Sequence, residues 1–315
     1  MDNILQIIIP AYNAKKTLDV TLSSIAVQRT DYRFSVLIVN DHSDYDYSDF
    51  IKKYSKYFNI EEIFLKKNVG PYMARQKGID NSSSKYVIFV DADDILYSPY
   101  SIDRMIRVIE NENLDLLIGD YFIEKDGMQV KTKDPVSLFG KVYKRSFLEK
   151  NNIVFRNIRC KGEIAYNKLI MLLNPHFNFL SLPTYVYKYN HISDSNSIIK
   201  DKPYDFESFA DNIMWAMKKA LNNNIKKEVL YEETCNTMLS AFYYYLDAVN
   251  KNDKKKVLKA FKEIFDKYYK KELMNKLNYL FAIRRIENSF NNVITYNDFI
   301  LKMEEYNDWF NNTCI

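Results

Sequence analysis

The sequence predicts an α/β fold, a Rossmann-like and mostly parallel sheet flanked by helices, followed by an all-helical region. Short apolar segments alternate with helical patterns from residue 4 to residue 121. This alternation is typical of a parallel sheet whose strands are joined by right-handed crossovers. From residue 204 onward only helical stripes remain, so we place a boundary between an α/β part, residues 1–200, and a helical part, residues 201–315.

Four short segments predict the strands of the first half, namely residues 4–9, 34–39, 61–65 and 86–94. Short apolar runs bounded by polar residues suit strands that helices cover on both faces. Between the strands, apolar residues at helical spacing predict helices from about residue 16, around residues 50–57 and over residues 73–79. Pro10 is expected to end the first strand, because proline is tolerated at a strand end and not in its middle.

Polar residues follow each of these strands. Because the carboxyl ends of parallel strands meet at one edge of the sheet, where open α/β folds bind ligands, we expect these residues to become neighbours. They are Tyr12, Asp41, Asn68 and Asp91.

Three carboxylates, Asp91, Asp93 and Asp94, end the fourth segment. They would repel one another unless a positive charge lay between them, and a hard divalent cation that bridges to a phosphate satisfies this need. The alternative is a solvated, Asp-rich turn after an ordinary strand.

The second half of the α/β part is less regular. After residue 101 the pattern predicts a helix, a strand over 114–121 and an irregular or hairpin-like segment over 130–139. A basic stretch over 141–145, a helix from Gly162 and an edge strand over 185–189 follow. The helical part shows three apolar stripes, over residues 206–217, 235–246 and 257–268.

The composition indicates an ordinary globular chain of 315 residues, 47% hydrophobic, with 6 Gly and 7 Pro. A net charge of +4 is too small to indicate a nucleic-acid partner. Cys160, Cys235 and Cys314 are distant from one another and odd in number, which predicts no disulfide framework or zinc site. Without a signal-like N-terminus or an apolar run of about 18 residues, we expect a cytoplasmic protein.

Four motifs occur in a fixed order at the strand ends. They are Pro10-Ala11-Tyr12-Asn13, then Asp41 with Ser43, then Asn68-x-Gly70-x-x-x-Ala74-Arg75 with Gly78, and Asp91-Ala92-Asp93-Asp94. Each motif is weak alone, but the ordered set is specific. Through these motifs, the first two-thirds of the chain resembles the family 2 inverting glycosyltransferases of GT-A fold.

This resemblance implies metal-dependent transfer of a sugar from a nucleotide-sugar, most often a UDP-sugar, to a hydroxyl of a bacterial cell-surface glycan or polymer. Residues 1–100 would bind the nucleotide-sugar and residues 101–200 the acceptor. Asp93 would ligate Mn²⁺ or Mg²⁺, with His191 as a further candidate for the metal or the diphosphate. The residues that would bind the donor nucleotide are Pro10, Tyr12, Asn13, Asp41, Asn68, Arg75, Asp91 and Ala92.

The resemblance also implies a catalytic base, which removes the acceptor proton. Family members carry it in an acidic pair that leads a helix; here Gly162 stands in place of the first acid and Glu163 at the base position. The alternative is that Glu163 only favours the positive helix N-terminus. Asp94 and Lys141 are further candidates for acceptor or diphosphate contacts. For Lys141 the alternative, which is at least equally supported, is that it lies on a solvated face.

The sequence departs from the family pattern at other positions. Asn40 and His42 replace an acid and a glycine, and Gln76 follows Arg75 where asparagine is usual. Two other functions are alternatives. A sugar nucleotidyltransferase would carry a glycine-rich loop with Arg and Lys after the first strand, which this chain lacks, and a non-catalytic nucleotide-sugar-binding scaffold would have less need of Asp91, Asp93 and Glu163 together.

Residues 251–277 carry ten lysines and four acids around an apolar stripe. One interpretation is an amphipathic surface that binds either an anionic membrane or a polyanionic acceptor. In the first case the protein would lie at the inner face of the membrane. The preferred interpretation is a solvated lysine face on a helix that packs against its neighbour. Self-association through this region is a further possibility that the sequence leaves open.

Overall fold

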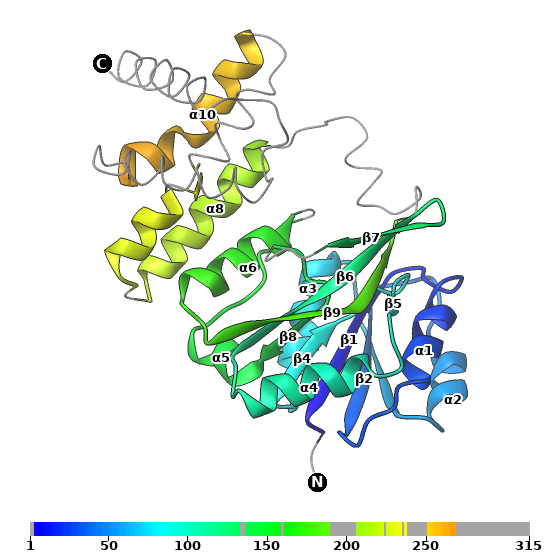
Figure 1. Ribbon diagram of the computed structural model, residues 1–315. Coiled ribbons are helices and arrows are strands. Elements are labelled where there is room, and N and C mark those ends of the chain that lie inside the picture. Colours follow the sequence, from blue (N-terminus) through cyan, green and yellow to red (C-terminus); the bar gives the residue numbers. More distant parts are fainter. Residues whose placement is uncertain are drawn as a thin grey trace. The chain divides into compact units, whose positions relative to one another are not determined.

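The computed structural model describes residues 3–132, 136–158, 161–189, 206–223, 225–234, 236–237 and 251–268 (Figure 1). The chain divides into two compact units, Met1–Asp201 and Lys202–Ile315. Among the helices described, none is long and apolar enough to cross a lipid bilayer.

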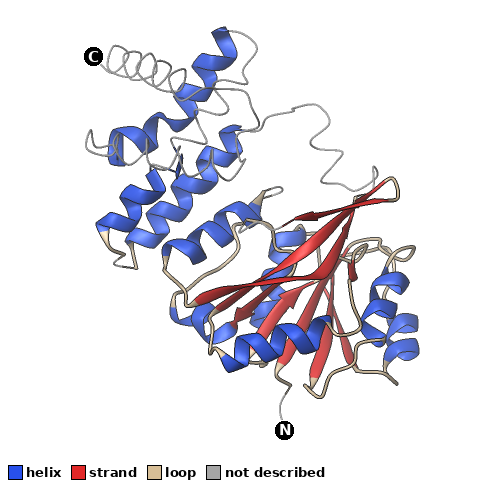
Figure 2. Ribbon diagram, in the orientation of Figure 1, coloured by secondary structure: helices blue, strands red, loops and turns tan. Residues whose placement is uncertain are grey.

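The described strands of the first unit form one nine-stranded sheet with helices on both faces (Figure 2). The strand order is β3-β2-β1-β4-β8-β6-β9-β5, and β7 pairs with β6 outside this path. The parallel half of the sheet and its helices comprise β1 (Leu5–Ala11), α1 (Leu18–Ala26), β2 (Phe34–Asn40), α2 (Ser48–Tyr54), β3 (Asn59–Phe64), α3 (Pro71–Asp80) and β4 (Tyr86–Phe89). These elements confirm the predicted alternation of strands and helices.

The other half of the sheet is mixed, because β8 runs antiparallel to β4 and β6, whereas β6 and β9 are parallel. The hairpin lies earlier than predicted: it is formed by residues 116–125 and 128–132, and it overlaps the segment predicted as irregular or hairpin-like, 130–139, only at residues 130–132. The elements of this half are β5 (Ile95–Leu96), α4 (Ser101–Asn111), β6 (Leu116–Lys125), β7 (Met128–Thr132), β8 (Lys141–Lys144), α5 (Arg145–Lys150), α6 (Gly162–Leu172) and β9 (Phe177–Lys188).

The prediction of an edge strand over 185–189 is wrong. Tyr185 and Val186 of β9 pair with β6 on one side and with β5 on the other. The two-residue strand β5 was missed because a pairing this short leaves no periodic pattern in the sequence. Strand β5 follows the acidic loop directly and pairs with β9. It therefore connects the acidic loop to β9.

The strand β1 is buried on both faces, as its continuous apolar run predicts. Leu5, Ile7 and Ile9 belong to the core cluster that includes residues of α1 and α4. Ile8 points to the opposite face, where it meets Gly78 of α3. Burial on both faces explains why the pattern is continuous rather than alternating.

Pro10 does not end β1, contrary to expectation, and it pairs with Val39 inside the strand. The Ile8 carbonyl accepts a hydrogen bond from Val90 on the β4 side of the strand. Two residues further on, the backbone of Pro10 faces that same side, where the register with β4 has already ended. The missing N–H of proline therefore removes no hydrogen bond from the sheet.

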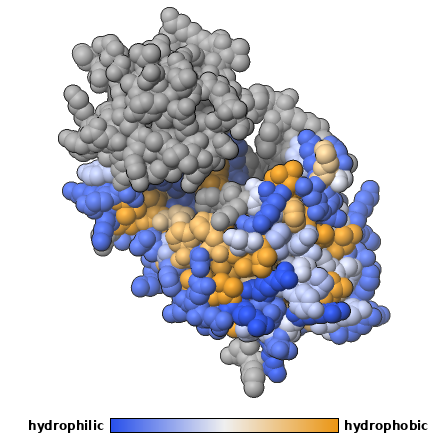
Figure 3. All heavy atoms as spheres, viewed as in Figure 1, coloured by the Kyte–Doolittle hydropathy of each residue, from blue (hydrophilic) through white to orange (hydrophobic). Residues whose placement is uncertain are grey.

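The face of the first unit along which β9 runs shows hydrophobic residues between hydrophilic ones (Figure 3). The large apolar side chains of β9 that are exposed are Phe179 and Leu182. Scattered exposed apolar residues are ordinary on protein surfaces, so this distribution by itself indicates no function.

In the second unit, α8 (Phe206–Leu221) and α10 (Lys251–Tyr268) confirm the first and third predicted stripes as helices. The two helices pack through Phe209 and Phe261, whose ring centroids are 6.2 Å apart. On α10, Lys256 and Lys259 are exposed, which agrees with a solvated lysine face within the described part. The second stripe and residues 269–277 lie outside the described residues.

Candidate active site

The loops after β2 and β3 are joined by Asp41. Its carboxylate accepts the backbone N–H of Val69 at 2.7 Å and that of Gly70 at 2.8 Å. The side-chain amide of Asn68 donates to the Asp41 carbonyl at 3.1 Å. Asp41 is buried, and burial raises its pKa. The predicted neighbours Asp41 and Asn68 therefore lie together at the sheet edge.

Gly70 has a φ of +84°, and Pro71 begins α3 directly after it. Open space surrounds the position where a Cβ of residue 70 would lie, so it is the positive φ that requires glycine here. Proline suits the first helical position, because its fixed φ is already helical. This turn aims the start of α3, which carries Tyr72 and Arg75, into the site.

The loop after β1 meets the loop after β2. The Asn13 backbone N–H donates to the Ser43 hydroxyl at 2.9 Å, and the Asn13 side chain accepts the Asp44 N–H at 3.2 Å. Tyr12 is 49% exposed, so its ring is available to a ligand at this edge. Pro10 lies two residues before it in β1.

The acidic loop after β4 divides its three carboxylates between two environments. Asp91 and Asp93 are partly exposed, whereas Asp94 is fully buried. Asp94 accepts the Tyr185 hydroxyl at 2.6 Å and the Lys188 N–H at 2.7 Å. Burial and the charges of Asp91 and Asp93 raise the pKa of Asp94 well above its usual value. Asp94 was predicted as an acceptor or diphosphate contact, but the structure places it inside the protein, where it holds β9.

Sequence reasoning missed two tyrosines of β9. The Tyr185 hydroxyl donates to Asp94 and accepts the Asp91 N–H at 3.1 Å, so it holds both ends of the acidic loop. Burial and the nearby acids Asp94, Asp93 and Asp91 raise the pKa of Tyr187 to about 12. The alternation of tyrosines at 185 and 187 was visible, but nothing local connected it to an acidic loop so far away in the sequence.

Arg75 of α3 is buried and forms an ion pair with Asp91. Its guanidinium also lies over the ring of Tyr72, 5.6 Å from the centroid. The structure therefore brings together two predicted donor residues, one from α3 and one from the loop after β4. It also adds Tyr72, which precedes Arg75 by almost one helical turn.

The Tyr72 hydroxyl donates a hydrogen bond to the carboxylate of Glu163 in the first turn of α6. Glu163, Tyr72, Arg75 and Asp91 thus form one continuous series of contacts. The predicted base lies at one end of this series and the acidic loop at the other.

Lys141 is not on a solvated face, which corrects that interpretation. It is 1% exposed in β8, and its ammonium donates to the Ser137 carbonyl. The amide of Asn167 in α6 donates to the same carbonyl at 2.9 Å. Lys141 therefore holds the loop before β8. His191 lies outside the described residues, and its assignment stays a prediction.

Among the described carboxylates, Asp91 and Asp93 are the candidate ligands of a divalent cation. Within the described ranges, no group of three or more His, Cys, Asp or Glu side chains gathers at one point. Mg²⁺ and similar ions are commonly held by one or two carboxylates, with substrate phosphates completing the coordination. The partly exposed Asp91 and Asp93 supply hard oxygen ligands of this kind, so the residues fit a cation that arrives with a diphosphate.

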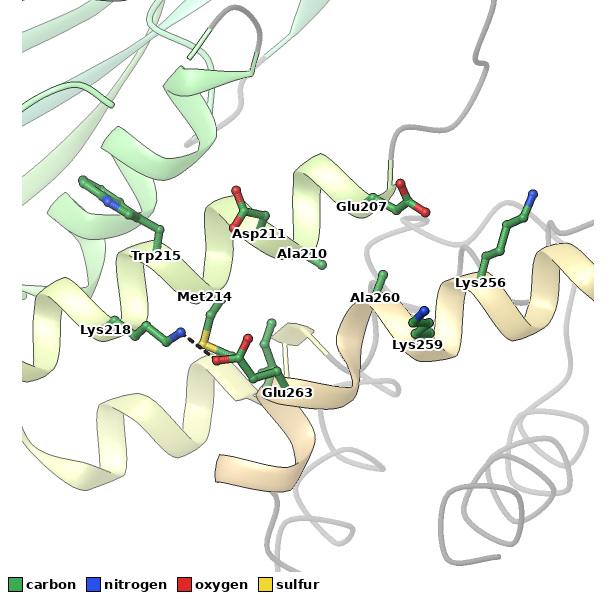
Figure 4. A pocket seen from close by; sticks show the side chains of 11 residues that line it. Glu207, Ala210, Asp211, Met214, Trp215, Lys218, Lys256, Lys259, Ala260 and Glu263 are labelled. Carbon is green, nitrogen blue, oxygen red and sulfur yellow. Dashed lines mark hydrogen bonds and ion pairs between the residues drawn. The ribbon is translucent and has the colours of Figure 1, made fainter. Parts of the chain in front are cut away.

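A hollow of about 500 Å³ lies between α8 and α10 of the second unit (Figure 4). It is lined by three lysines, three acids and apolar residues, and Lys218 pairs with Glu263 at 2.6 Å. No residue predicted for the site lines it, and its charges are balanced. The described residues predicted for the site lie in the first unit instead.

Comparison with known proteins now identifies the family. The family model described as Glycosyl transferase family 2 matches residues 6–170. A curated relative is poly(ribitol-phosphate) β-N-acetylglucosaminyltransferase TarP of Staphylococcus aureus, 26% identical over 65% of this chain and 68% of its own length. The chain spans only 20% and 31% of the length of two other curated relatives.

Two solved structures share the fold. S. aureus TarS in complex with UDP-GlcNAc has a TM-score of 0.69 at 20% identity, covering 88% of this chain and 87% of TarS. The mannosyltransferase PcManGT of Pyrobaculum calidifontis, in complex with GDP-Man and Mn²⁺, has a TM-score of 0.54 at 12% identity, covering 90% and 81%. The predicted fold class is confirmed, and because the family model matches more than half of the chain, this protein belongs to glycosyl transferase family 2.

Proposed function

We propose that the protein is an inverting, metal-dependent glycosyltransferase that moves a sugar from a UDP-sugar to a hydroxyl of a cell-surface polymer. The observation that carries the proposal is the continuous series from the acidic loop through Arg75 and Tyr72 to Glu163. It places a carboxylate suited to accept a proton beside residues suited to a nucleotide diphosphate. Family membership and the likeness to a UDP-GlcNAc complex support the donor class.

The donor would bind at the strand ends. Tyr12 offers an exposed ring to the base, and Asp41, with Asn68, shapes the loop that lies beside it. Asp91 and Arg75 would face the ribose and diphosphate, and Ala92, buried between two acids, keeps the loop close to the sheet. Asp93, with Asp91, would hold the divalent cation, which supplies positive charge for the departing diphosphate.

The transfer is a single displacement. The acceptor oxygen forms a bond to the anomeric carbon while the bond between that carbon and the diphosphate oxygen breaks, and the electron pair leaves with the nucleoside diphosphate. The hydroxyl proton passes to the Glu163 carboxylate, which acts as general base. Attack on the face opposite the leaving group inverts the configuration of the anomeric carbon.

The acceptor class is supported by the relative TarP, which is named for poly(ribitol-phosphate). A repeating polymer of this kind offers many equivalent hydroxyls. No feature of the described residues selects one polymer over another, so the proposal extends to hydroxyl-bearing cell-surface polymers as a class.

A thermal-shift series on the full chain tests the proposal. UDP-, GDP- and dTDP-linked sugars are compared, each with and without Mn²⁺. A ligand at about one hundred times its Kd stabilises by about 2.7 kcal/mol, which is about 4 °C for a chain of this size. We expect UDP-sugars to give this shift only with Mn²⁺. Melting temperatures that stay constant for every nucleotide-sugar would contradict the proposal.

A further inference from the structure

Tyr72 is enclosed on all sides. It is 8% exposed, and its ring stacks on Phe155 with the centroids 6.0 Å apart and the planes 28° apart. The Arg75 guanidinium lies 5.6 Å from the ring centroid. Gly162 also lies against the ring carbons. Packing therefore fixes the ring in one position, whereas the ring of a surface tyrosine can change rotamer.

Gly162 leaves the space that the Tyr72 ring occupies. A Cβ at residue 162 would lie 2.8 Å from ring carbons of Tyr72, closer than real side chains approach. Gly162 is also the residue at which α6 begins, directly before Glu163. The absence of a side chain at 162 thus allows the ring of α3 to lie against the start of α6, within reach of Glu163.

The hydroxyl of Tyr72 donates to Oε2 of Glu163. Burial and the Glu163 charge raise the pKa of Tyr72 well above its usual value, against the opposite effect of the Arg75 charge and the Gly162 N–H. The phenol consequently stays protonated at neutral pH and acts as a donor. Within the described residues this is the hydrogen bond that holds the Glu163 carboxylate, and Oε1 remains to accept a proton.

We propose that Tyr72 is a positioning residue for Glu163. Its fixed ring and hydroxyl hold one carboxylate oxygen, so that the other oxygen faces the acceptor hydroxyl. The inference rests on the proposed function, since it requires that Glu163 accepts the proton. The same ring supports Arg75, so α3 positions the donor-side cation and the base together.

The first test compares Tyr72→Phe with Tyr54→Phe in the full chain. Tyr54 is a matched control, because it is also buried and its hydroxyl donates to a carboxylate, Asp19, at 2.9 Å. Turnover is measured as release of UDP from UDP-GlcNAc with poly(ribitol phosphate) as acceptor.

We expect Tyr72→Phe to lower kcat by about 10- to 100-fold, the effect of losing a hydrogen bond to a charged group. The KM for UDP-GlcNAc should change less than about twofold, because the ring that supports Arg75 remains. Tyr54→Phe should alter none of these quantities.

Two outcomes are distinguished by including Glu163→Gln. If Glu163→Gln abolishes turnover but Tyr72→Phe keeps the wild-type kcat, the positioning role is wrong and the proposed function stands. If Glu163→Gln itself turns over normally, the proposed base is wrong and the role of Tyr72 fails with it.

A second measurement requires no substrate. A double-mutant cycle of Tyr72→Phe and Glu163→Ala, by urea unfolding of the full chain, reports the coupling of the two side chains directly. We expect the two effects on the unfolding equilibrium constant to differ from additivity by more than about tenfold. Additive effects would overturn the proposal whatever the substrates are.

Discussion

Asp93 and Asp94 are adjacent in sequence and differ in environment. Asp94 is buried and holds β9, whereas Asp93 is partly exposed beside Asp91. The sequence motif predicted three similar carboxylates at this place. Of the three, Asp94 enters the core, where it meets Tyr185, and this follows from the tertiary structure alone.

We expect Asp93→Ala to abolish the increase in UDP affinity that Mn²⁺ confers. The loss should be at least about tenfold, because even outer partners of a metal ligand contribute 10- to 100-fold. Calorimetric titration of UDP with and without Mn²⁺ measures it, with the exposed Asp31→Ala as control. Unchanged affinity in the presence of Mn²⁺ would remove Asp93 from the metal site.

Glu163→Gln keeps the shape of the side chain and removes its basicity. We expect UDP affinity within about twofold of wild type and a fall in kcat of about 100-fold or more, the usual contribution of a general base. UDP binding is measured by calorimetry and turnover by UDP release. Wild-type turnover in this variant would exclude Glu163 as the base and leave it as a helix N-terminal acid.

Strand β9 is the element that supports the acidic loop. Tyr185 joins the Asp94 side chain to the Asp91 backbone, and the Lys188 N–H adds a second contact. The residues proposed to bind the donor therefore depend on β9, which itself holds none of the residues predicted for the site.

We expect Tyr185→Phe to destabilise the protein by about 1–3 kcal/mol, because a buried carboxylate and a backbone N–H lose their partner. The Mn²⁺-dependent affinity for UDP should fall as well, since the loop is no longer held. Urea unfolding and calorimetry measure the two effects. Tyr143→Phe, which removes a buried hydroxyl bonded to Asn167 at 2.9 Å, should lower stability without altering UDP affinity.

Helix α3 lies close to β1 because Gly78 has no side chain. A Cβ at residue 78 would overlap the Ile8 side chain. We expect Gly78→Ala to cost about 1–3 kcal/mol, the usual penalty of overpacking. Adding Ile8→Ala should cost less in this background than in the wild type, because it relieves the overlap. Strictly additive effects in urea unfolding would show that α3 and β1 are not in direct contact here.

At the scale of the whole molecule, a core cluster described for the first unit draws its side chains from that unit. The residues of its core cluster and those packed against it all lie between Ile4 and Tyr187. The described residues of the candidate site lie in the same range. Folding and donor binding are therefore expected to belong to the first unit.

We expect a fragment of residues 1–201 to unfold cooperatively in urea and to bind UDP with Mn²⁺ within about threefold of the full chain, because a domain with its own core can fold alone. Circular dichroism and calorimetry are the measurements. A fragment without a cooperative transition would show that the first unit needs residues beyond 201.

The sequence by itself determined the alternation of strands and helices, the family and the residues that follow each parallel strand. These features are encoded locally, because periodicity reports burial and a strand end delivers its next residues to a known edge. Tertiary structure alone decided that Tyr72 meets Glu163 and that Tyr185 meets Asp94, pairs that are each 91 positions apart. Such contacts depend on how helices and strands pack across the sheet, and a pattern along one chain carries no record of that geometry.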